Sequence, residues 1–382
     1  MAIDSASSPI PKMPPAAGSD LSTVMPDEQT PLLDGGKSME AATAGLGLSQ
    51  AGASSSGSKH RMPRAVAHRG YKAAAPENSM LAFRAAVEAG AHAVETDLHL
   101  SKDGVVVLSH DATLKRCFGV DAKVRDCEWV FLSTLRTTQE PAEPMVRLLD
   151  LLEYLNEDER VDVGVLLDIK TDDDAAELMQ KTAETIASVP GIRPWSERIL
   201  PCCWTTEYVK LTQSLLPNFP IAHVGVSTEY ARALADNISG LRISLLAHAL
   251  ATPVVGKRFV RRMRRTGHPV YAWTVNDEDW MRWAIGARLD GVITDDPKLF
   301  LDVCRRVAAE EEDAAGGGKK EGSGGGNGGE VVTPVRRRAR MTAVPGRLFN
   351  WARYLFFLTV VSVIYFARWG LPSRQVPKVL GS

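Results

Sequence analysis

Short apolar runs alternate with longer amphipathic stretches between residues 64 and 309, and this alternation is the main structural signal of the chain. The short runs predict strands over Arg64–Ala67, His92–Leu98, Asp162–Ile169, Arg198–Cys203, Ile221–Val226, Leu241–Leu246, Pro269–Val275 and Gly291–Thr294. The amphipathic stretches predict helices over Ser79–Ala89, Asp174–Val189, Glu207–Leu216, Pro253–Thr266 and Asp277–Gly286. Strands that alternate with helices indicate a parallel sheet whose helices are the crossover connections.

Eight strands with helical crossovers predict an α/β fold of the (β/α)8 type, a TIM barrel. The stretch from Val105 to about Leu148 is too long for a simple connection. It predicts a hairpin and a small insertion over the barrel mouth, after the second strand. A doubly wound open sheet is the alternative, but no Gly-rich dinucleotide-binding turn follows the first strand.

The flanking segments differ in composition from the predicted barrel of residues 64–309. Residues 1–63 are rich in Ala, Ser, Gly and Pro, which predicts a disordered N-terminal arm. The arm has no apolar leader, so we expect neither secretion nor an N-terminal anchor. Glu28 to Leu33 has the form of an acidic dileucine sorting signal, although so short a pattern often arises by chance. Residues 310–347 predict a Gly-rich and then basic linker.

A hydrophobic segment near the C-terminus predicts membrane attachment over residues 348–371, followed by a short tail at 372–382. Its uncharged centre, Tyr354–Ala367, has 14 residues and is bracketed by Arg353 and Arg368. A single spanning helix needs roughly 20 apolar residues. The segment therefore either spans with help from snorkelling arginines, as a transmembrane helix, or dips into one leaflet.

The charge of this region predicts its partner and its orientation. Residues 331–382 contain no Asp or Glu and nine basic residues, which favours anionic lipids. Six basic residues precede the apolar centre and three follow it. The positive-inside rule then predicts a cytosolic catalytic domain, on the endoplasmic reticulum, the mitochondrial surface or lipid droplets. Five cysteines without metal-type spacing fit a reducing compartment. We expect no nucleic-acid partner, and the sequence identifies no protein partner.

Three carboxylates fall near the ends of predicted strands. Glu95 and Asp97 are two residues apart, so both leave the same face of their strand. Active-site groups of barrels collect at the carboxyl ends of strands, and buried carboxylates there require a cation or basic partners. Asp168 and Lys170 repeat the arrangement on the third predicted strand. Three carboxylates favour one Mg²⁺ or Ca²⁺ over zinc, with Lys170 facing a phosphate.

Two histidines lie where apolar runs end, beside other charged residues. His68 precedes Arg69, whose guanidinium suits a phosphate, and His110 follows the run Val105–Leu108. We assign structural roles to the remaining histidines, which lack polar neighbours of the kind needed: His60, His92, His99, His223, His248 and His268. Glu77 orients a catalytic side chain or the metal shell, or else serves a helix N-terminus. Trp273 either walls the pocket or packs in the barrel.

The ordered series of motifs from about Ala65 to Pro297 resembles the glycerophosphodiester phosphodiesterase family. The motifs are His-Arg-Gly, Pro-Glu-Asn, Glu-x-Asp, Asp-Gly-x-x-x-x-x-His-Asp, Asp-x-Lys, Trp-Thr-Val-Asn and Ile-Thr-Asp-x-Pro. The resemblance implies a barrel with a divalent metal at its mouth. It implies that the acid–base pair is His68 and His110, the metal ligands are Glu95, Asp97 and Asp168, and the phosphate ligands are Arg69 and Lys170. Many members have Glu where this chain has Asp168, which leaves the metal open.

Within that family, the chain is most similar to the fungal phosphatidylglycerol phospholipase C type. The cues are Leu167–Lys170, Trp273–Asn276, Ile293–Pro297 and the hydrophobic tail. This similarity implies hydrolysis of phosphatidylglycerol to diacylglycerol and glycerol phosphate at a membrane surface. The alternatives are a lysophospholipase D, a diesterase for other glycerophosphodiesters, and an inactive lipid-binding barrel. Both histidines and all three carboxylates are present, which argues against the inactive barrel.

Overall fold

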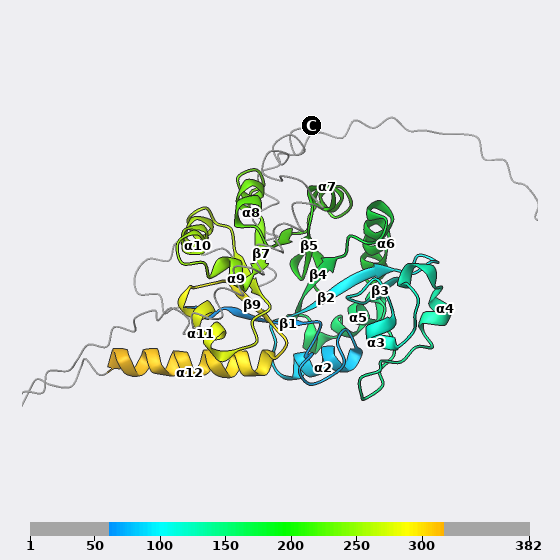
Figure 1. The fold of residues 1–382 in the computed structure, drawn as a ribbon, viewed down its shortest axis with the longest axis horizontal. Helices are drawn as coiled ribbons and strands as arrows, with labels where there is room; N and C mark the ends of the chain where they lie inside the picture. The colour runs from blue at the N-terminus through cyan, green and yellow to red at the C-terminus, as the bar shows by residue number, and fades with distance from the viewer. Residues whose placement is uncertain (1–60, 317–382) are drawn as a thin grey trace, which may run out of the picture. The chain divides into compact units, whose positions relative to one another are not determined.

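The computed structural model describes residues 61–316, and these form a barrel of eight parallel strands surrounded by helices (Figure 1). The barrel strands are β1 (Arg64–His68), β2 (Ala93–Leu100), β4 (Gly164–Ile169), β5 (Ile199–Cys203), β6 (Ala222–Gly225), β7 (Arg242–Leu246), β8 (Val270–Trp273) and β9 (Gly291–Thr294). The barrel is closed because β1 pairs in parallel with both β2 and β9. The predicted TIM barrel is therefore confirmed, and the open sheet is excluded.

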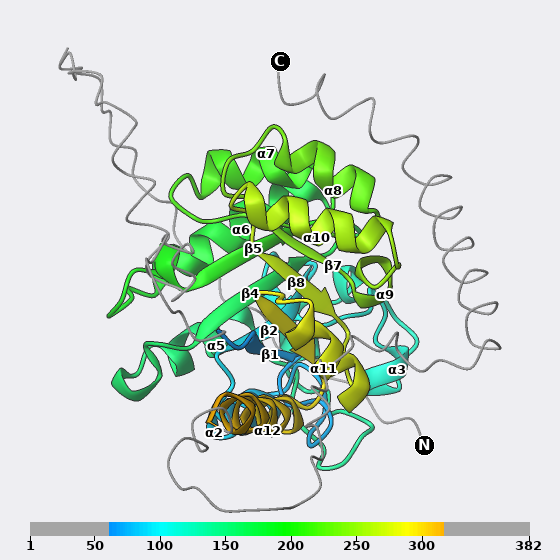
Figure 2. The ribbon, with the colours of Figure 1, turned by 90° about the vertical axis from the view of Figure 1, so that its left-hand side faces the viewer.

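The helices lie on the outside of the barrel. They are α2 (Met80–Glu88), α5 (Leu148–Leu155), α6 (Ala175–Ser188), α7 (Thr206–Leu215), α8 (Thr228–Ala235), α9 (Ala247–Leu250), α10 (Val255–Arg265), α11 (Glu278–Gly286) and α12 (Pro297–Gly316). Short 3-10 turns lie at η2 (Asp158–Arg160) and η3 (Trp195–Glu197). Polar side chains begin several helices, for example Ser79 for α2 and Asp174 for α6. The last helix, α12, lies beside α2, which closes the ring of helices (Figures 1 and 2).

The expected insertion follows the second barrel strand. Strand β3 (Val106–Leu108) pairs antiparallel with β2 and forms the hairpin. After it come α3 (Lys115–Phe118), η1 (Val124–Asp126) and α4 (Trp129–Leu132). The insertion has a small apolar core of its own, built on Val107, Leu114, Val124, Leu132, Leu135 and Met145. It therefore holds a fixed shape next to the site.

Side-chain alternation along the strands separates two layers of core. One face of each strand packs against the helices and joins the larger apolar cluster, as Val94 and Ile243 do. The other face fills the barrel interior with Val66, Ala93, Leu166, Leu200, Cys202, Ala222, Val224, Tyr271 and Ile293. Interior positions nearer the carboxyl ends of the strands lie at the mouth. This is how the fold brings polar side chains of separate strands together.

The structure differs from the sequence prediction at the C-terminal end of the barrel domain and in several additional helices. Helix α12 runs through Gly316, past the expected end of the barrel at residue 309. Residues 310–315 are acids and alanines, and Arg282 donates two hydrogen bonds to Glu310, so the helix continues. The stretches that form α5, α8, α9 and α12 were not predicted as helices.

Several predictions fall on residues 1–60 and 317–382, which lie outside the described residues. They are the N-terminal arm, its dileucine-like pattern, most of the linker 310–347, the membrane segment 348–371 and the tail 372–382. Within residues 61–316, no helix has the length and apolar character needed to cross a membrane.

Candidate active site

A cavity of about 260 Å³ lies at the carboxyl ends of the barrel strands. Its lining is His68, Arg69, Glu95, Asp97, His110, Leu166, Asp168, Lys170, Cys202, Trp204, Val224, Ser244, Trp273, Thr274 and Ile293. The lining includes every residue predicted for the site except Glu77, which lies behind Arg69. The fold therefore brings the predicted residues together.

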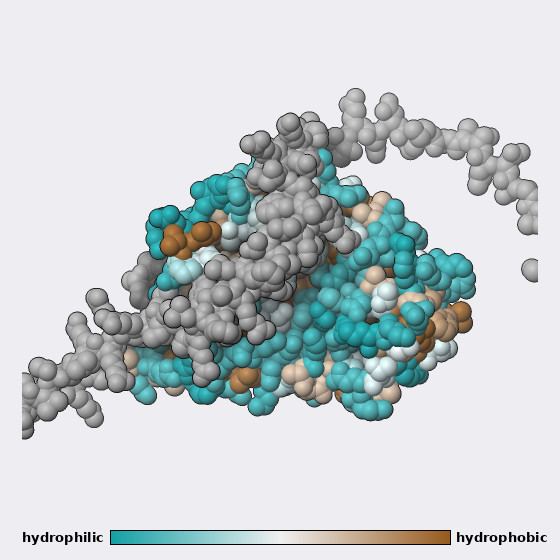
Figure 3. Space-filling view, viewed as in Figure 1, coloured by the Kyte–Doolittle hydropathy of each residue, from teal (hydrophilic) through white to brown (hydrophobic). Residues whose placement is uncertain are grey.

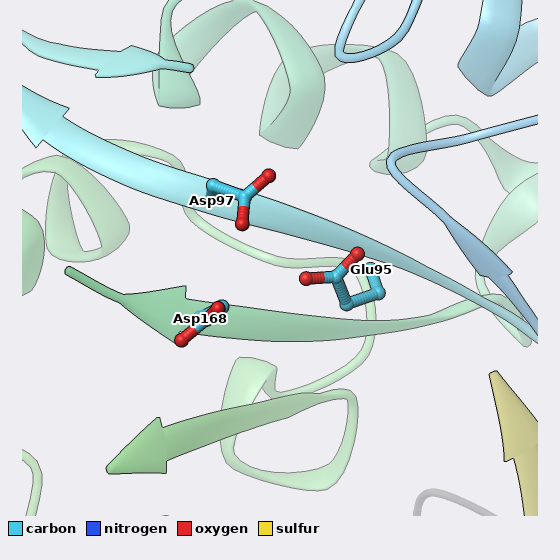
Figure 4. Close-up of side chains that lie close together, drawn as sticks. All are labelled: Glu95, Asp97 and Asp168. Atoms are coloured by element: carbon cyan, nitrogen blue, oxygen red, sulfur yellow. The ribbon is translucent and has the colours of Figure 1, made fainter. Parts of the chain in front are cut away.

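The three predicted carboxylates form one cluster. The strand register places Asp97 directly opposite Asp168, and Glu95 precedes Asp97 by two residues on the same strand. Oxygen atoms of the three groups lie within 4.8 Å of one another, and all three side chains are buried (Figure 4). A candidate ligand set made of carboxylate oxygens alone, with no histidine or cysteine in it, suits a hard divalent cation. The residues present therefore fit the expected metal.

The electrostatics of the cluster show an excess of negative charge. Burial raises the pKa of Glu95 well above its usual range, and the neighbouring Asp97 and Asp168 raise it further. Burial alone would raise the pKa of Asp97 too, but the cations Lys170 and Arg69 lower it. The site therefore holds one carboxyl that is hard to ionise beside another that stays ionised. A divalent cation would favour the ionised form of both.

Lys170 supplies a cation to this cluster. Its Nζ lies 2.8 Å from Asp97 Oδ1 and 2.7 Å from Asp168 Oδ2. Burial alone would lower the pKa of Lys170, but Asp168 and Asp97 raise it above its usual range. The side chain lines the cavity, as predicted, and its direct partners here are the two carboxylates.

The turn after β1 places Arg69 over the carboxylates. Arg69 has a φ of 56° and Gly70 a φ of 79°, and a Cβ on Gly70 would lie 2.7 Å from Ala82. Glycine at this position thus lets the turn approach α2 closely. The Arg69 backbone N–H donates to Glu95 at 2.9 Å, and its Nη1 donates to Glu77 at 2.9 Å. These bonds fix the guanidinium at the cavity wall.

Each predicted catalytic histidine has a carboxylate partner. His68 Nδ1 lies 2.5 Å from Asp295 Oδ1, and His110 Nδ1 lies 2.8 Å from Asp111 Oδ1. These contacts orient the rings and leave the Nε2 atoms for proton exchange. Burial lowers the pKa of His110, and the nearby Lys170 lowers it further. Neutral His110 is thus favoured near neutral pH, as a general base requires.

Glu77 binds arginines and connects Arg69 to the insertion. It accepts from Arg69 and from Arg116 of α3, whose Nη2 donates at 2.7 Å. Burial alone would raise the pKa of Glu77, but Arg116 and Arg69 lower it to about 2. Arg116 also donates to Asp111, the partner of His110. Glu77 therefore positions side chains on both sides of the cavity, which was one of its predicted roles.

The opposite wall of the cavity is apolar. Trp204 and Trp273 meet edge to face with ring centroids 6.0 Å apart. The indole N–H of Trp204 donates to Asp168 at 2.7 Å, and that of Trp273 donates to the Ser244 carbonyl at 3.1 Å. Trp273 lines the cavity and also packs against the barrel core.

Sequence reasoning gave no role in the site to several residues that contact the predicted groups, among them Asn78, Asp111, Arg116, Trp204 and Asp295. Asn78 donates to Asp97 at 3.0 Å, and Asn276 donates to Asp295 at 2.9 Å. Asn78 and Asp295 lie inside motifs quoted for the family resemblance, so a signal was present. For Trp204 the signal was its place directly after a predicted strand.

The other histidines in the described residues lie outside the cavity lining. One expectation about them was wrong: His99 does have a polar partner, because its Nδ1 lies 2.7 Å from Asp173. The pair is buried beside the end of β2. By contrast, the ring nitrogens of His92, His223 and His268 hydrogen-bond to backbone atoms, as structural residues do.

Comparison with known proteins agrees with this geometry. The sequence model of the glycerophosphoryl diester phosphodiesterase family matches residues 68–299. A probable glycerophosphodiester phosphodiesterase 2 of Mycobacterium tuberculosis is 29% identical, over 63% of this chain and 89% of the relative. Lysophospholipase D GDPD1 of Rattus norvegicus is 26% identical, over 65% of this chain and 88% of the relative.

Solved structures show the same fold. A glycerophosphodiester phosphodiesterase from Thermotoga maritima is 28% identical with a TM-score of 0.50, and the match covers 64% of this chain and 100% of that one. A phosphodiesterase from Oleispira antarctica, solved with its product sn-glycerol-3-phosphate, is 22% identical with a TM-score of 0.55, covering 64% and 97%. The chain belongs to the glycerophosphoryl diester phosphodiesterase family and is a phosphoric diester hydrolase.

Proposed function

We propose that this enzyme cleaves phosphatidylglycerol to diacylglycerol and glycerol phosphate, as a divalent-metal-dependent phospholipase C at a membrane surface. One observation supports it above the others: a single cavity is lined by two carboxylate-bound histidines, three clustered carboxylates and an apolar wall. The first two features suit hydrolysis of a phosphodiester. The third suits the glycerol carbons next to the phosphate.

The size of the cavity bears on how a lipid would bind. Pockets for drug-sized ligands enclose about 300–1,000 Å³. A cavity of about 260 Å³ accommodates a glycerophosphate headgroup but not two acyl chains. The acyl chains would then stay outside the barrel, in the membrane. This agrees with action at a membrane surface. The expectation that the barrel lies on the cytosolic side of the endoplasmic reticulum, mitochondria or lipid droplets rests on the charge of residues 331–382.

The metal would be held by Glu95, Asp97 and Asp168, which offer oxygen ligands and the needed negative charge. When bound, Mg²⁺ or Ca²⁺ would stabilise the negative charge that develops on the phosphoryl group. Arg69 lies at the same wall and adds a fixed positive charge for the phosphate. Lys170, which lines the same cavity and pairs with Asp97 and Asp168, limits the repulsion between these carboxylates.

The two histidines would carry the protons. His110, whose neutral form is favoured, takes the proton from the headgroup hydroxyl next to the phosphoester, and this oxygen attacks phosphorus. His68, paired with Asp295, gives a proton to the departing diacylglycerol oxygen as its bond to phosphorus breaks. Water then opens the cyclic glycerophosphate. In this second step the histidines exchange roles, which returns both to their starting states.

A lysophospholipase D is the second candidate, and the similarity to the rat lysophospholipase D favours it. The same groups would then act on a phosphodiester bound in the opposite direction, so the headgroup alcohol leaves. The two candidates differ in their products. A phospholipase C releases a neutral lipid and a water-soluble phosphate, whereas a phospholipase D leaves the phosphate on the lipid.

The test is product identification with the purified full chain. Phosphatidylglycerol, phosphatidylinositol, lysophosphatidylcholine and glycerophosphocholine are each incubated with Mg²⁺ or Ca²⁺, and products are identified by mass spectrometry. We expect diacylglycerol and glycerol phosphate from phosphatidylglycerol, and no such products from the His110→Ala control. Faster turnover of lysophosphatidylcholine, with the phosphate left on the lipid, would establish the second candidate instead.

A further inference from the structure

Helix α10, which lies outside the active-site cavity, has a dense cluster of positive charges. Within its 11 residues it has six basic side chains, all exposed, and no acid. They are Lys257, Arg258, Arg261, Arg262, Arg264 and Arg265. The opposite face, with Phe259, Val260 and Met263, is buried against the barrel. The helix thus presents a purely basic face to solvent, in a chain whose net charge is −1.

These cations are mostly without acidic partners. Within residues 61–316, ion pairing on the helix is limited to Arg262, which lies 2.6 Å from Asp236. Helix α12 provides the contrast, because its basic residues Lys298, Arg305 and Arg306 all pair with acids. Within residues 61–316, single exposed basic residues elsewhere, such as Lys123, Arg232 and Arg288, also lack an ion-pair partner. Helix α10 differs because five such residues lie on one helix.

Helix stability does not explain the pattern. Arg258, Arg261, Arg262 and Arg265 follow the spacing i, i+3, i+4 and i+7, so they share one stripe and repel one another. Lys257 and Arg258 lie in the first turn, where the helix dipole disfavours positive charge, whereas Arg262, Arg264 and Arg265 lie in the last turn, where the dipole favours it. The four stripe arginines and Thr266 line a surface hollow of about 380 Å³. Like charges that repel one another around a surface hollow indicate an anionic partner.

Two exposed apolar residues next to the helix indicate what kind of anion. Val254 is 56% exposed and Val255 61% exposed, directly before and at the start of α10. Figure 3 shows a small hydrophobic area at the position that α10 has in Figure 1, surrounded by hydrophilic surface. Since α10 lies between β7 and β8, its N-terminus is at the mouth end of the barrel. Apolar side chains beside a cluster of arginines match the interface of an anionic bilayer.

We propose that α10, together with Val254 and Val255, binds the surface of a bilayer that contains anionic phospholipids. The choice of a bilayer rests on the proposed function, because a lipid substrate makes a membrane the natural partner. Single-stranded nucleic acid is disfavoured because the exposed face of α10 has no aromatic side chain on which bases stack. The contact would keep the barrel at the membrane independently of any other segment.

The experiment measures binding of the full chain to vesicles by sedimentation. One set of vesicles is phosphatidylcholine, and the other contains about one third phosphatidylserine, which supplies anionic charge without being the proposed substrate. The test variant is Arg258→Gln/Arg261→Gln/Arg265→Gln. The control variant, Lys102→Gln/Lys298→Gln/Arg305→Gln, removes the same charge from three exposed residues elsewhere. Hydrolysis of glycerophosphocholine and thermal melting show whether each variant is folded.

We expect the test variant to bind phosphatidylserine vesicles about 100-fold more weakly than the wild type, since each basic residue near the surface contributes about fivefold. The control variant should lose less than about tenfold. A loss no greater than that of the control overturns the proposal. So does retained vesicle binding with loss of binding to a short RNA, which would assign α10 to nucleic acid. Because phosphatidylserine measures binding alone, failure to hydrolyse phosphatidylglycerol leaves this result interpretable.

Discussion

The two halves of the barrel mouth differ in the polarity of the side chains that they supply to the cavity. The half built on β1, β2, β4 and the insertion supplies charged groups that form ion pairs with one another, among them Arg69, Asp97 and Lys170. The half built on β5 to β9 supplies mainly apolar or neutral side chains, such as Trp204, Val224 and Trp273. The contrast indicates that the first half carries the chemistry and the second half shapes the space for the substrate.

The charged half should also tolerate substitutions less well than the apolar half. Its members are buried and tied to several partners, so loss of one leaves others uncompensated. The half built on β5 to β9 has few such ties: Trp204 donates to Asp168, and Asp295, which follows β9, pairs with His68. Substitutions in the two halves should therefore differ in size and in the quantity that they affect.

The largest effect is expected from the histidines. His68→Ala and His110→Ala should each lower kcat by about 10²–10⁴-fold, because a general acid or base contributes that much. Circular dichroism and thermal melting should show an unchanged fold. The matched control is His248→Ala, which removes a ring that packs at a tilt against Trp280 outside the cavity lining. Near-normal turnover by either active-site variant would show that the acid–base assignment is wrong.

The next effect concerns stability and the arginine contacts of Glu77. The pKa of Glu77 falls from its usual 4.5 to about 2 in the folded state, so its ionised form stabilises the fold above pH 4.5. That stability, about 3 kcal/mol at most, is lost as the pH falls from 4.5 toward 2. Urea unfolding at pH 6 and pH 3 measures it. Glu77→Gln should be less stable at pH 6 and change less between the two pH values. An equal pH dependence in the two proteins contradicts the assignment.

The apolar wall should affect substrate binding more than turnover. Trp273→Leu removes aromatic surface from the cavity and should raise KM by about tenfold, in keeping with about 1–3 kcal/mol for a change in an apolar pocket. The value of kcat should change less. The measurement is steady-state kinetics on phosphatidylglycerol in mixed micelles. If kcat falls as steeply as in the histidine variants, the division into two halves does not hold.

The smallest effect is a shift in the acid limb of the pH profile. Because burial lowers the pKa of His110 below its usual 6.5, the ring loses its proton at a lower pH than a free histidine. The value of kcat/KM should therefore stay high down to a pH below 6.5 and fall only at more acid pH. Lys170→Gln removes a charge that lowers this pKa, so it should move the acid limb upward. A limb that stays in place in this variant would rule out the effect of Lys170.

Much of the charged half could be predicted from sequence because its signals are local. Alternation along one strand places Glu95 and Asp97 on the same face, and the fold class places strand ends together. The partners of these residues are not local. Asp295 is 227 residues from His68 in the chain, and Arg116 is 39 residues from Glu77. Such contacts depend on closure of the barrel and on the shape of the insertion, which no local pattern encodes.

The apolar half and the last helix were harder to predict for a different reason. Trp204 follows a continuous buried run, where packing and pocket roles look the same in sequence. The acidic end of α12 resembles the start of a linker until its contact with Arg282 is known. In both cases the role depends on a contact with a residue of another element: Asp168 of β4 for Trp204, and Arg282 of α11 for Glu310.

The most direct test of the account is metal dependence of the charged half. The full chain is treated with EDTA and then titrated with Mg²⁺ or Ca²⁺, while hydrolysis of glycerophosphocholine and metal binding by calorimetry are both followed. We expect no turnover in EDTA, recovery with added metal, and at least about tenfold weaker metal binding in Glu95→Gln, Asp97→Asn and Asp168→Asn. Glu184→Gln, an exposed residue of α6, should bind metal as the wild type does. Full turnover in EDTA, or unchanged metal binding in all three carboxylate variants, would contradict the account.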